Sequence, residues 1–225
     1  PSVTEQIETG KTFYRGKRGA QKFIAYFQTA TNTYAPVGRL KPLYDEALLQ
    51  DDIVGISVGT RPDCVPGEVL DLFEEYAENR HVWLEYGLQS IHDRTLERIN
   101  RGHNAAAFLD AVERTAGRGI NICVHIIVGL PGETREDVLQ TSRVLASLPI
   151  QGIKIHLLLA LAGLEVLGDR QQHAVALEDL ALVGVVDRRD LDALGLDVLP
   201  DVELGPVRQR EHPDVLARVD SAVVE

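Results

Sequence analysis

Four short strings of polar residues and glycines lie at or just beyond apolar runs of strand length. They are Gly59-Thr-Arg-Pro-Asp-Cys64, Glu85-Tyr-Gly-Leu-Gln89, Arg101-Gly-His103 and Gly129-Leu-Pro-Gly-Glu133. In parallel α/β sheets a ligand binds outside the carboxyl ends of the strands, where loops and helix N-termini converge. The carboxylate, guanidinium, imidazole and amide groups of these strings therefore predict a ligand site along one rim of such a sheet.

Glu85 lies in the middle of the apolar run 82–88. A carboxylate inside a buried strand is costly unless it is paired, hydrogen-bonded or bound to a ligand. Gly87 would let another group approach the strand backbone closely, and Gln89 adds a second polar side chain at the strand end. The alternative is an edge strand on which Glu85 faces solvent.

Three histidines accompany these strings. His103 follows Arg101, while His125 and His156 each lie inside an apolar run that is expected to form a strand. A single histidine in a strand is usually a satisfied core residue, but two on adjacent strands near Glu85 favour a site with titratable groups. These histidines do not have the spacing of zinc ligands, so no metal is predicted on them.

Two further loops carry groups that could bind a ligand. Gln28 and Thr29 begin a loop of uncharged hydrogen-bonding side chains, which could bind an ammonium or carboxylate group; an ordinary polar loop before a helix is the alternative. Arg61 could bind a carboxylate or phosphate through its planar guanidinium. Equally, Arg61 could pair with Asp63 inside its own loop.

The turn Gly129–Glu133 leads from an apolar run into a helix that Thr134 is expected to cap, with acidic residues in its first turn. The glycines of this turn would let a flat ligand such as a purine approach the backbone. Turns from strand to helix often contain glycine in any case, so the turn is weak evidence when taken alone.

The elements that must position these groups follow from hydrophobic spacing. Strands are expected at 22–28, 53–59, 81–88, 120–128 and 152–159, and helices at 37–49, 66–79, 92–100, 105–117 and 134–147. A capping box at Ser2 and Glu5 predicts a first helix that runs to about Arg18, and Gly119 is expected to cap the helix 105–117.

The strands recur about every 30 to 40 residues and are apolar on both faces, as parallel strands covered by helices are. A complete eight-stranded barrel needs about 250 residues. The fold class predicted is therefore α/β, with a partial (β/α) parallel barrel of about five strands.

Composition limits the classes of function. The chain has 225 residues, 23 Lys and Arg against 34 Asp and Glu, and a net charge of −11, which argues against broad electrostatic binding to nucleic acid or anionic membranes. Cys64 and Cys123 are too few for a disulfide framework, so a reducing cytoplasm is expected. No apolar run reaches the roughly 18 residues that a membrane span requires.

Taken in order, the strings resemble the radical S-adenosylmethionine superfamily, in the branch related to the catalytic subunit of Elongator and its uncharacterised bacterial relatives. The resemblance covers about residues 1–164. It rests on Ala25-Tyr-Phe-Gln-Thr29, Val58-Gly-Thr-Arg-Pro-Asp-Cys64, Glu85-Tyr-Gly-Leu-Gln-Ser-Ile-His-Asp93, Ile99-Asn-Arg-Gly-His103 and Val128-Gly-Leu-Pro-Gly-Glu133.

This resemblance implies a part-barrel that holds a [4Fe-4S] cluster and S-adenosylmethionine. One electron, from a donor such as flavodoxin or ferredoxin, would split the cofactor into methionine and a 5′-deoxyadenosyl radical, which abstracts hydrogen from a substrate. Relatives imply an RNA substrate, although the acidic composition gives that idea no support.

The resemblance also implies cofactor-binding roles for residues at the strand ends. Gln28 and Thr29 would face the methionyl end of the cofactor, and Glu85 and Gln89 would contact its ribose and methionyl region. The remaining implied contacts are Ile127, Gly129, Gly132 and Glu133 along the adenine, and Arg61, His125 and His156 towards the radical cavity.

Two departures from the family pattern shape the expectation. The Cys-x3-Cys-x2-Cys loop that holds the cluster is absent, and neither Cys64 nor Cys123 has that spacing. We expect an amino-terminal truncation that removed the first strand and this loop, which places the cluster cysteines upstream of Pro1. The chain alone would then bind no cluster and would be inactive. Residues 1–164 are expected to form the truncated part-barrel, and 165–225 a divergent tail or a small appended α/β segment.

Two other functions remain open from the sequence. One is a cluster-free binding or regulatory module on the same part-barrel. The other is an ordinary barrel lyase or aldolase that uses Glu85 and a histidine for acid–base chemistry, with Lys154 as the candidate lysine.

Overall fold

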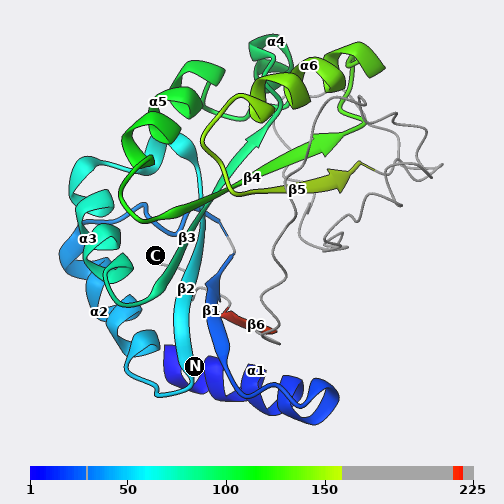
Figure 1. Cartoon of the computed structure of the whole chain (residues 1–225). Coiled ribbons are helices and arrows are strands. Elements are labelled where there is room, and N and C mark those ends of the chain that lie inside the picture. Colours follow the sequence, from blue (N-terminus) through cyan, green and yellow to red (C-terminus); the bar gives the residue numbers. More distant parts are fainter. Residues whose placement is uncertain (29, 159–214, 220–225) are drawn as a thin grey trace.

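The computed structural model describes residues 1–28 and 30–158, together with the backbone of 215–219 (Figure 1). After a first helix, strands and helices alternate along the chain. The elements are α1 (Val3–Arg18), β1 (Phe23–Phe27), α2 (Val37–Leu48), β2 (Ile53–Thr60), a 3-10 turn (Pro62–Cys64), α3 (Gly67–Ala77), β3 (His81–Gln89), α4 (Asp93–Arg98), α5 (Ala105–Thr115), β4 (Asn121–Val128), α6 (Arg135–Ala146), β5 (Gly152–Leu157) and β6 (Val215–Val219).

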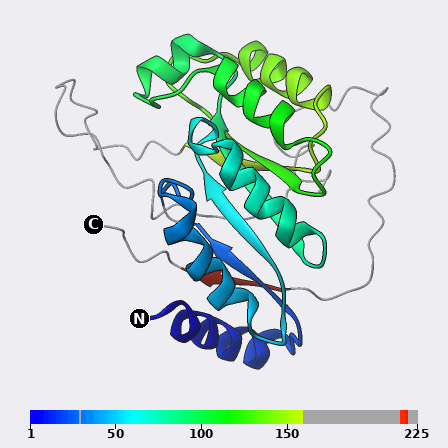
Figure 2. The ribbon, with the colours of Figure 1, turned by 90° about the vertical axis from the view of Figure 1, so that its left-hand side faces the viewer.

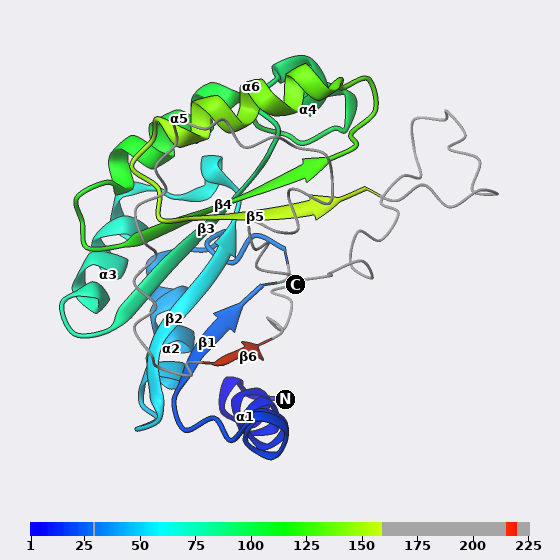
Figure 3. The same cartoon turned by 45° about the vertical axis from the view of Figure 1, so that its right-hand side comes forward.

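The strands form one sheet in the order β5-β4-β3-β2-β1-β6, and every neighbouring pair is parallel. The sheet curls, and the helices that follow its strands lie on the convex side (Figures 1 and 2). Figure 3 shows the same strands fanning out around the concave side. The predicted partial parallel barrel with five strands is confirmed.

A sixth strand, β6, pairs with β1 and was not predicted. It belongs to the segment 165–225, whose interpretation as a tail or appended segment otherwise falls outside the described residues. The proposed boundary at 164 also falls outside them.

The alternation of β3 explains how one strand serves both the core and the concave face. Val82, Leu84, Tyr86 and Leu88 are buried in the hydrophobic core with residues of the covering helices. Successive side chains of a strand point to opposite faces, so Glu85 lies on the other, concave side. A slip of one residue would exchange the two faces, which is why the core pattern sets the register.

The local signals of the first helix are confirmed. The Glu5 N–H donates to Ser2 Oγ at 3.1 Å, and the Ser2 N–H donates to the Glu5 carboxylate at 2.7 Å, which completes the predicted capping box. Gly19 ends α1 at φ 65°, a conformation that glycine adopts without strain.

The predicted ends of three helices, α3, α4 and α5, lie two residues beyond the observed ones, and the predicted cap of α5 was wrong. α5 stops at Thr115 with Ala116 as its C-cap, so Gly119 lies beyond the helix rather than capping it; Gly117 already leaves the helical region at φ 82°. α4 stops at Arg98 because Asn100 turns the chain at φ 53°, and the Arg101 N–H then bonds to the Leu96 carbonyl oxygen at 2.9 Å.

In the parts of the chain that the structure describes, no helix has the length and apolar character needed to cross a membrane.

Candidate functional site

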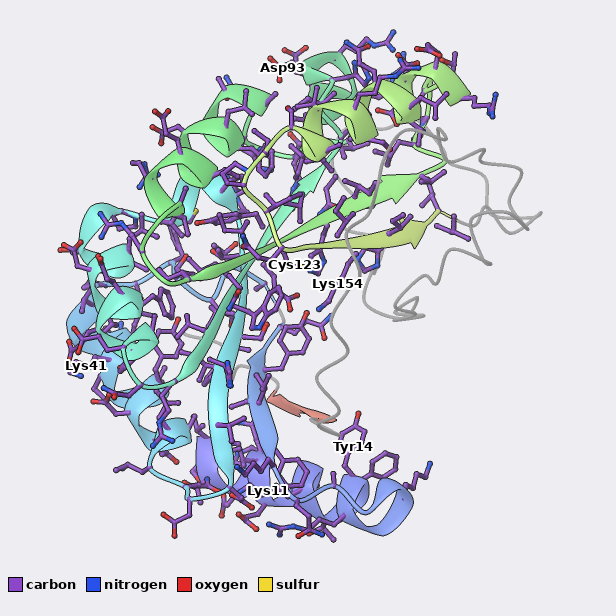
Figure 4. The ribbon with its side chains drawn as sticks, viewed as in Figure 1. Lys11, Tyr14, Lys41, Asp93, Cys123 and Lys154 are labelled. Carbon is purple, nitrogen blue, oxygen red and sulfur yellow. The ribbon has the colours of Figure 1, made fainter. Side chains whose placement is uncertain are left out.

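Polar side chains from five neighbouring strands gather on the concave face of the sheet, and we call them the Glu85 cluster. Its members are Tyr26 (β1), Ser57 (β2), Glu85 (β3), His125 (β4), and Lys154 and His156 (β5). Figure 4 shows Lys154 on the concave side, among side chains of the neighbouring strands. Burying so many polar groups is tolerable because they satisfy one another.

Glu85 is the centre of this cluster and is 4% exposed. Its Oε2 accepts hydrogen bonds from Tyr26 OH at 2.7 Å, His125 Nε2 at 2.7 Å and Lys154 Nζ at 2.6 Å. Its Oε1 accepts from Ser57 Oγ at 2.6 Å and Lys154 Nζ at 2.8 Å. The expectation of a partnered, buried carboxylate is therefore confirmed, and a Glu85 that faces solvent is excluded.

The charge state of Glu85 follows from these contacts. Burial by itself would raise the pKa of the carboxyl group, but the hydrogen bond from His125 and the charge of Lys154 outweigh it and lower the pKa to about 2. Glu85 is thus ionised at neutral pH and can only accept hydrogen bonds. The Lys154 ammonium balances its charge.

Acid is expected to remove the stability that ionised Glu85 contributes. Its folded pKa of about 2 lies below the ordinary value of 4.5, so the contribution is complete above the ordinary value and is lost as the pH falls towards 2. In urea unfolding, the free energy should fall more steeply between about pH 5 and 3 in the wild type than in Glu85→Gln, which has no carboxyl group to titrate. Parallel profiles would contradict the lowered pKa.

The two histidines continue the hydrogen-bonded chain. The Nε2 atom of His156 lies 3.1 Å from Nδ1 of His125, and the two rings stack with centroids 5.1 Å apart. Burial lowers the pKa of His156 most, the neighbouring His125 imidazole and the Lys154 ammonium act in the same direction, and Glu85 acts in the opposite direction. The expectation that these histidines lie near Glu85 is confirmed.

Gln89 ends β3 in an unusual conformation. Its φ is 74°, and the register with β4 shifts between Gly87 and Gln89. The Gly87 carbonyl oxygen accepts hydrogen bonds from Arg101 Nη2 at 2.8 Å and from Arg101 Nε at 3.2 Å. Within the described chain, the buried Oε1 atom of Gln89 has no hydrogen-bond donor. An acceptor buried without a donor costs about 1–3 kcal/mol, so this atom calls for a donor from outside the described residues.

The turn Gly129–Glu133 follows β4 and is held by the segment after β3. Gly129 and Gly132 have φ of 93° and 82°. Arg98 Nη1 donates to the Pro131 carbonyl oxygen at 3.0 Å, and a Cβ at Gly132 would lie 1.9 Å from that Nη1. The Glu133 carboxylate accepts a hydrogen bond from Ser90, so one of its oxygens is already used within the protein.

Among the described residues, the other predicted site residues lie outside the hydrogen-bonded Glu85 cluster, although Ile127 is the register partner of His156 across β4 and β5. Arg61 pairs with Asp63 through Nε at 3.0 Å and Nη2 at 2.6 Å, and it also donates to the Gly102 carbonyl oxygen at 2.9 Å. Of its two open interpretations, the structure shows the pair within the loop. Gln28 directly follows β1, and half-buried Ile127 follows His125 by two positions on β4. Thr29 lies outside the described residues.

Sequence reasoning missed Tyr26 and Ser57, and it noted Lys154 only as a lyase candidate. A usable signal existed in the period of two along each strand. Ser57 is polar inside the apolar run 53–59, and Lys154 and His156 alternate with apolar neighbours. Aligning such positions across strands requires the register, which the sequence does not contain.

The described residues do not offer a metal centre. No group of three or more His, Cys, Asp or Glu residues within them could hold a metal ion. Burial, together with the nearby charge of Glu85, raises the pKa of the Cys123 thiol to about 12, so it is not a ready thiolate ligand. Cys64 is also a free thiol.

Comparisons with known proteins agree with this architecture. The family model described as the Radical SAM superfamily matches residues 3–145. An uncharacterised protein of Methanocaldococcus jannaschii is 41% identical over 162 residues, which are 72% of this chain and 49% of that protein. Protein YhcC of Escherichia coli K12 is 49% identical over 138 residues, 61% of this chain and 45% of YhcC. The chain spans about half the length of these curated relatives.

Among solved structures, archaeal Elp3 of Methanocaldococcus infernus, with an N-terminal deletion, superposes with a TM-score of 0.57. It is 17% identical, and the match covers 72% of this chain and 42% of that one. At this level of identity the likeness concerns the fold alone, and it agrees with the curled parallel sheet.

Proposed function

The chain belongs to the radical S-adenosylmethionine (radical SAM) superfamily, and we propose that its concave face is the nucleoside-binding part of an enzyme that uses this cofactor. Family members contain, in full-length form, S-adenosylmethionine and a [4Fe-4S] cluster, which together supply a 5′-deoxyadenosyl radical for hydrogen abstraction. The role of this chain's own residues would be to bind and orient the cofactor.

The buried amide oxygen of Gln89 carries the proposal. It lies at the carboxyl end of β3 and has no donor among the described residues. S-adenosylmethionine offers donors of the right kind in its ribose hydroxyls and its ammonium group. The glycine turn at Gly129 follows the neighbouring strand β4, where exposed backbone could lie against a flat base.

The residues present do not fit the iron–sulfur cluster. The chain has two cysteines, Cys64 and Cys123, and a cluster of this type needs several thiolates brought together. We therefore propose that the cluster ligands of the full-length enzyme come from outside these 225 residues, upstream of Pro1, and that the chain alone does not cleave the cofactor. The net charge of −11 disfavours broad electrostatic binding of RNA. An RNA substrate is therefore supported by the family resemblance alone.

A lyase that works through Lys154 is less well supported. An amine must be uncharged to attack a carbonyl group, whereas Lys154 lies within 2.6 Å and 2.8 Å of the two Glu85 oxygens and is 19% exposed. An ammonium held by a carboxylate in this way is a counter-charge rather than a nucleophile.

Direct binding of S-adenosylmethionine to the 225-residue chain tests the proposal. We expect saturable binding in equilibrium dialysis, and a loss of about three- to tenfold in affinity for Gln89→Ala, because one hydrogen bond is removed. Gln140→Ala is the matched control, since Gln140 is exposed on α6. No binding by the wild-type chain would overturn the proposal, and equal affinity of the two variants would exclude the role of Gln89.

In the complete gene product, anaerobic cluster reconstitution followed by reduction should yield 5′-deoxyadenosine. A protein that carries the cluster but forms none would favour the cluster-free binding module on the same part-barrel.

A further inference from the structure

The proton positions in the chain Glu85–His125–His156 follow from chemistry once the carboxylate is ionised. A carboxylate only accepts, so Nε2 of His125 must carry the proton of their 2.7 Å hydrogen bond. In the arrangement with an uncharged His125 ring, Nδ1 of His125 is the acceptor and Nε2 of His156 donates to it across 3.1 Å. This leaves Nδ1 of neutral His156 with a lone pair and no proton.

That nitrogen is the end of the hydrogen-bonded series Glu85–His125–His156 that has no partner among the described residues. No described residue donates a hydrogen bond to Nδ1 of His156, and the residue is only partly buried on β5. The other end is anchored, because Glu85 is held by Tyr26, Ser57 and Lys154 as well as by His125.

We propose that Nδ1 of His156 is the proton acceptor of the concave face, and that Glu85, acting through His125, holds it in the acceptor form. The inference rests on the proposed function, because a ligand in the hollow must present the proton. The chemical class of the group it takes is a hydroxyl or an ammonium, both of which donate.

Transfer of a proton to this atom needs no other reactant. The O–H or N–H bond of the ligand breaks, its electron pair stays on oxygen or nitrogen, and a new N–H bond forms at Nδ1 of His156. The imidazolium that results donates through Nε2 to His125, whose other nitrogen donates to the Glu85 carboxylate. The negative charge of Glu85 thus stabilises the positive charge that develops, as a carboxylate behind a histidine does in general acid–base sites.

The charged and titratable groups around His156 come from three strands. Burial opposes the protonated ring most, the His125 imidazole from β4 and the Lys154 ammonium from its own strand also oppose it, and Glu85 from β3 favours it. Because the groups that oppose protonation outweigh Glu85, the pKa of His156 is lowered. The ring is therefore neutral, and able to accept a proton, at neutral pH.

Imidazole ¹⁵N NMR of the full chain tests the proton positions. Both His125 and His156 should show a proton on Nε2 and a bare Nδ1 at neutral pH, with assignments from single His→Gln variants. A proton on Nδ1 of His156 overturns the inference.

Carbethoxylation by diethyl pyrocarbonate, followed by peptide mass spectrometry, tests whether the lone pair is open. His156 should react on the order of tenfold faster than His125, whose nitrogens both lie in hydrogen bonds that must break first.

Glu85→Gln should lower the midpoint of the His156 pH–rate profile by about half a unit, because the charge that favours protonation is lost. Glu78→Gln, an exposed carboxylate on the outside of the sheet, should leave it unchanged. Equal rates for the two histidines overturn the inference even if Glu85→Gln does not fold.

The pH dependence of S-adenosylmethionine binding separates this inference from the proposed function. Affinity should fall as the pH drops through the His156 midpoint, because a protonated ring cannot accept, and His156→Gln should abolish that dependence. An affinity that does not change across the His156 midpoint overturns the acceptor role and does not contradict the proposed function. No binding at any pH overturns the proposed function and removes the ligand on which this inference rests.

Discussion

Glu85→Ala is expected to lower the free energy of unfolding by about 3–5 kcal/mol, because removing one partner of a buried ion pair leaves the other charge uncompensated. The Lys154 ammonium would lose both of its contacts with the carboxylate, and His125 would lose the acceptor at 2.7 Å. Urea unfolding at neutral pH measures the loss.

Two comparisons make this prediction specific. Glu136→Ala removes an exposed partner of Arg143 and should cost no more than about 1 kcal/mol. Replacing both charges, with Glu85→Leu and Lys154→Met in one chain, should recover much of the loss, because no single buried charge remains. A loss of similar size for Glu85→Ala and Glu136→Ala would show that the buried contacts are not formed in solution.

Gly55→Ala is expected to cost about 3 kcal/mol, at the upper end of what overpacking causes. A Cβ at Gly55 would lie 2.0 Å from the carbonyl oxygen of His81, which is its partner across β2 and β3. The obstacle is backbone, so relief requires the two strands to separate and to lose ladder hydrogen bonds. The same strands carry Ser57 and Glu85, so the cluster should loosen as well.

Gly16→Ala serves as the matched control for this variant. Gly16 lies within α1, and nothing is within 4 Å of its added Cβ. Alanine there should raise the free energy of unfolding by about 0.5–1 kcal/mol, because glycine is the weaker helix former. A Gly55→Ala variant as stable as Gly16→Ala in thermal or urea unfolding would contradict the close approach of β2 and β3.

Local chemistry made much of the fold predictable. The capping box of α1, the Thr134 cap of α6 and the alternation of strand and helix depend on residues within one turn or one strand of each other, and they appear where the sequence places them. Glu85 was also predictable in kind, because an acidic residue in an apolar run needs partners wherever the chain folds. Helix ends were less predictable, since α5 was expected to run to Gly117 with Gly119 as its cap, whereas it stops at Thr115 with Ala116 as its C-cap.

The composition of the site depended on contacts between distant residues. Tyr26 and Lys154 are separated by 128 positions, yet their polar groups are 3.2 Å apart. Arg61 was equally compatible with a ligand or with Asp63 until the loop geometry showed the pair. Among the described residues Gln89 Oε1 has no donor, and it lies where the register of β3 with β4 shifts between Gly87 and Gln89, which depends on the pairing of two strands.

By itself the sequence determined that this chain forms parallel βα units whose strand ends carry polar groups, because the hydrophobic period and the cap residues act over a few positions. The curl of the sheet and the strand register decided which polar side chains meet. They brought Glu85, His125, His156 and Lys154 into one hydrogen-bonded cluster, since hydrogen bonds and ion pairs form over a few ångströms of space regardless of separation along the chain.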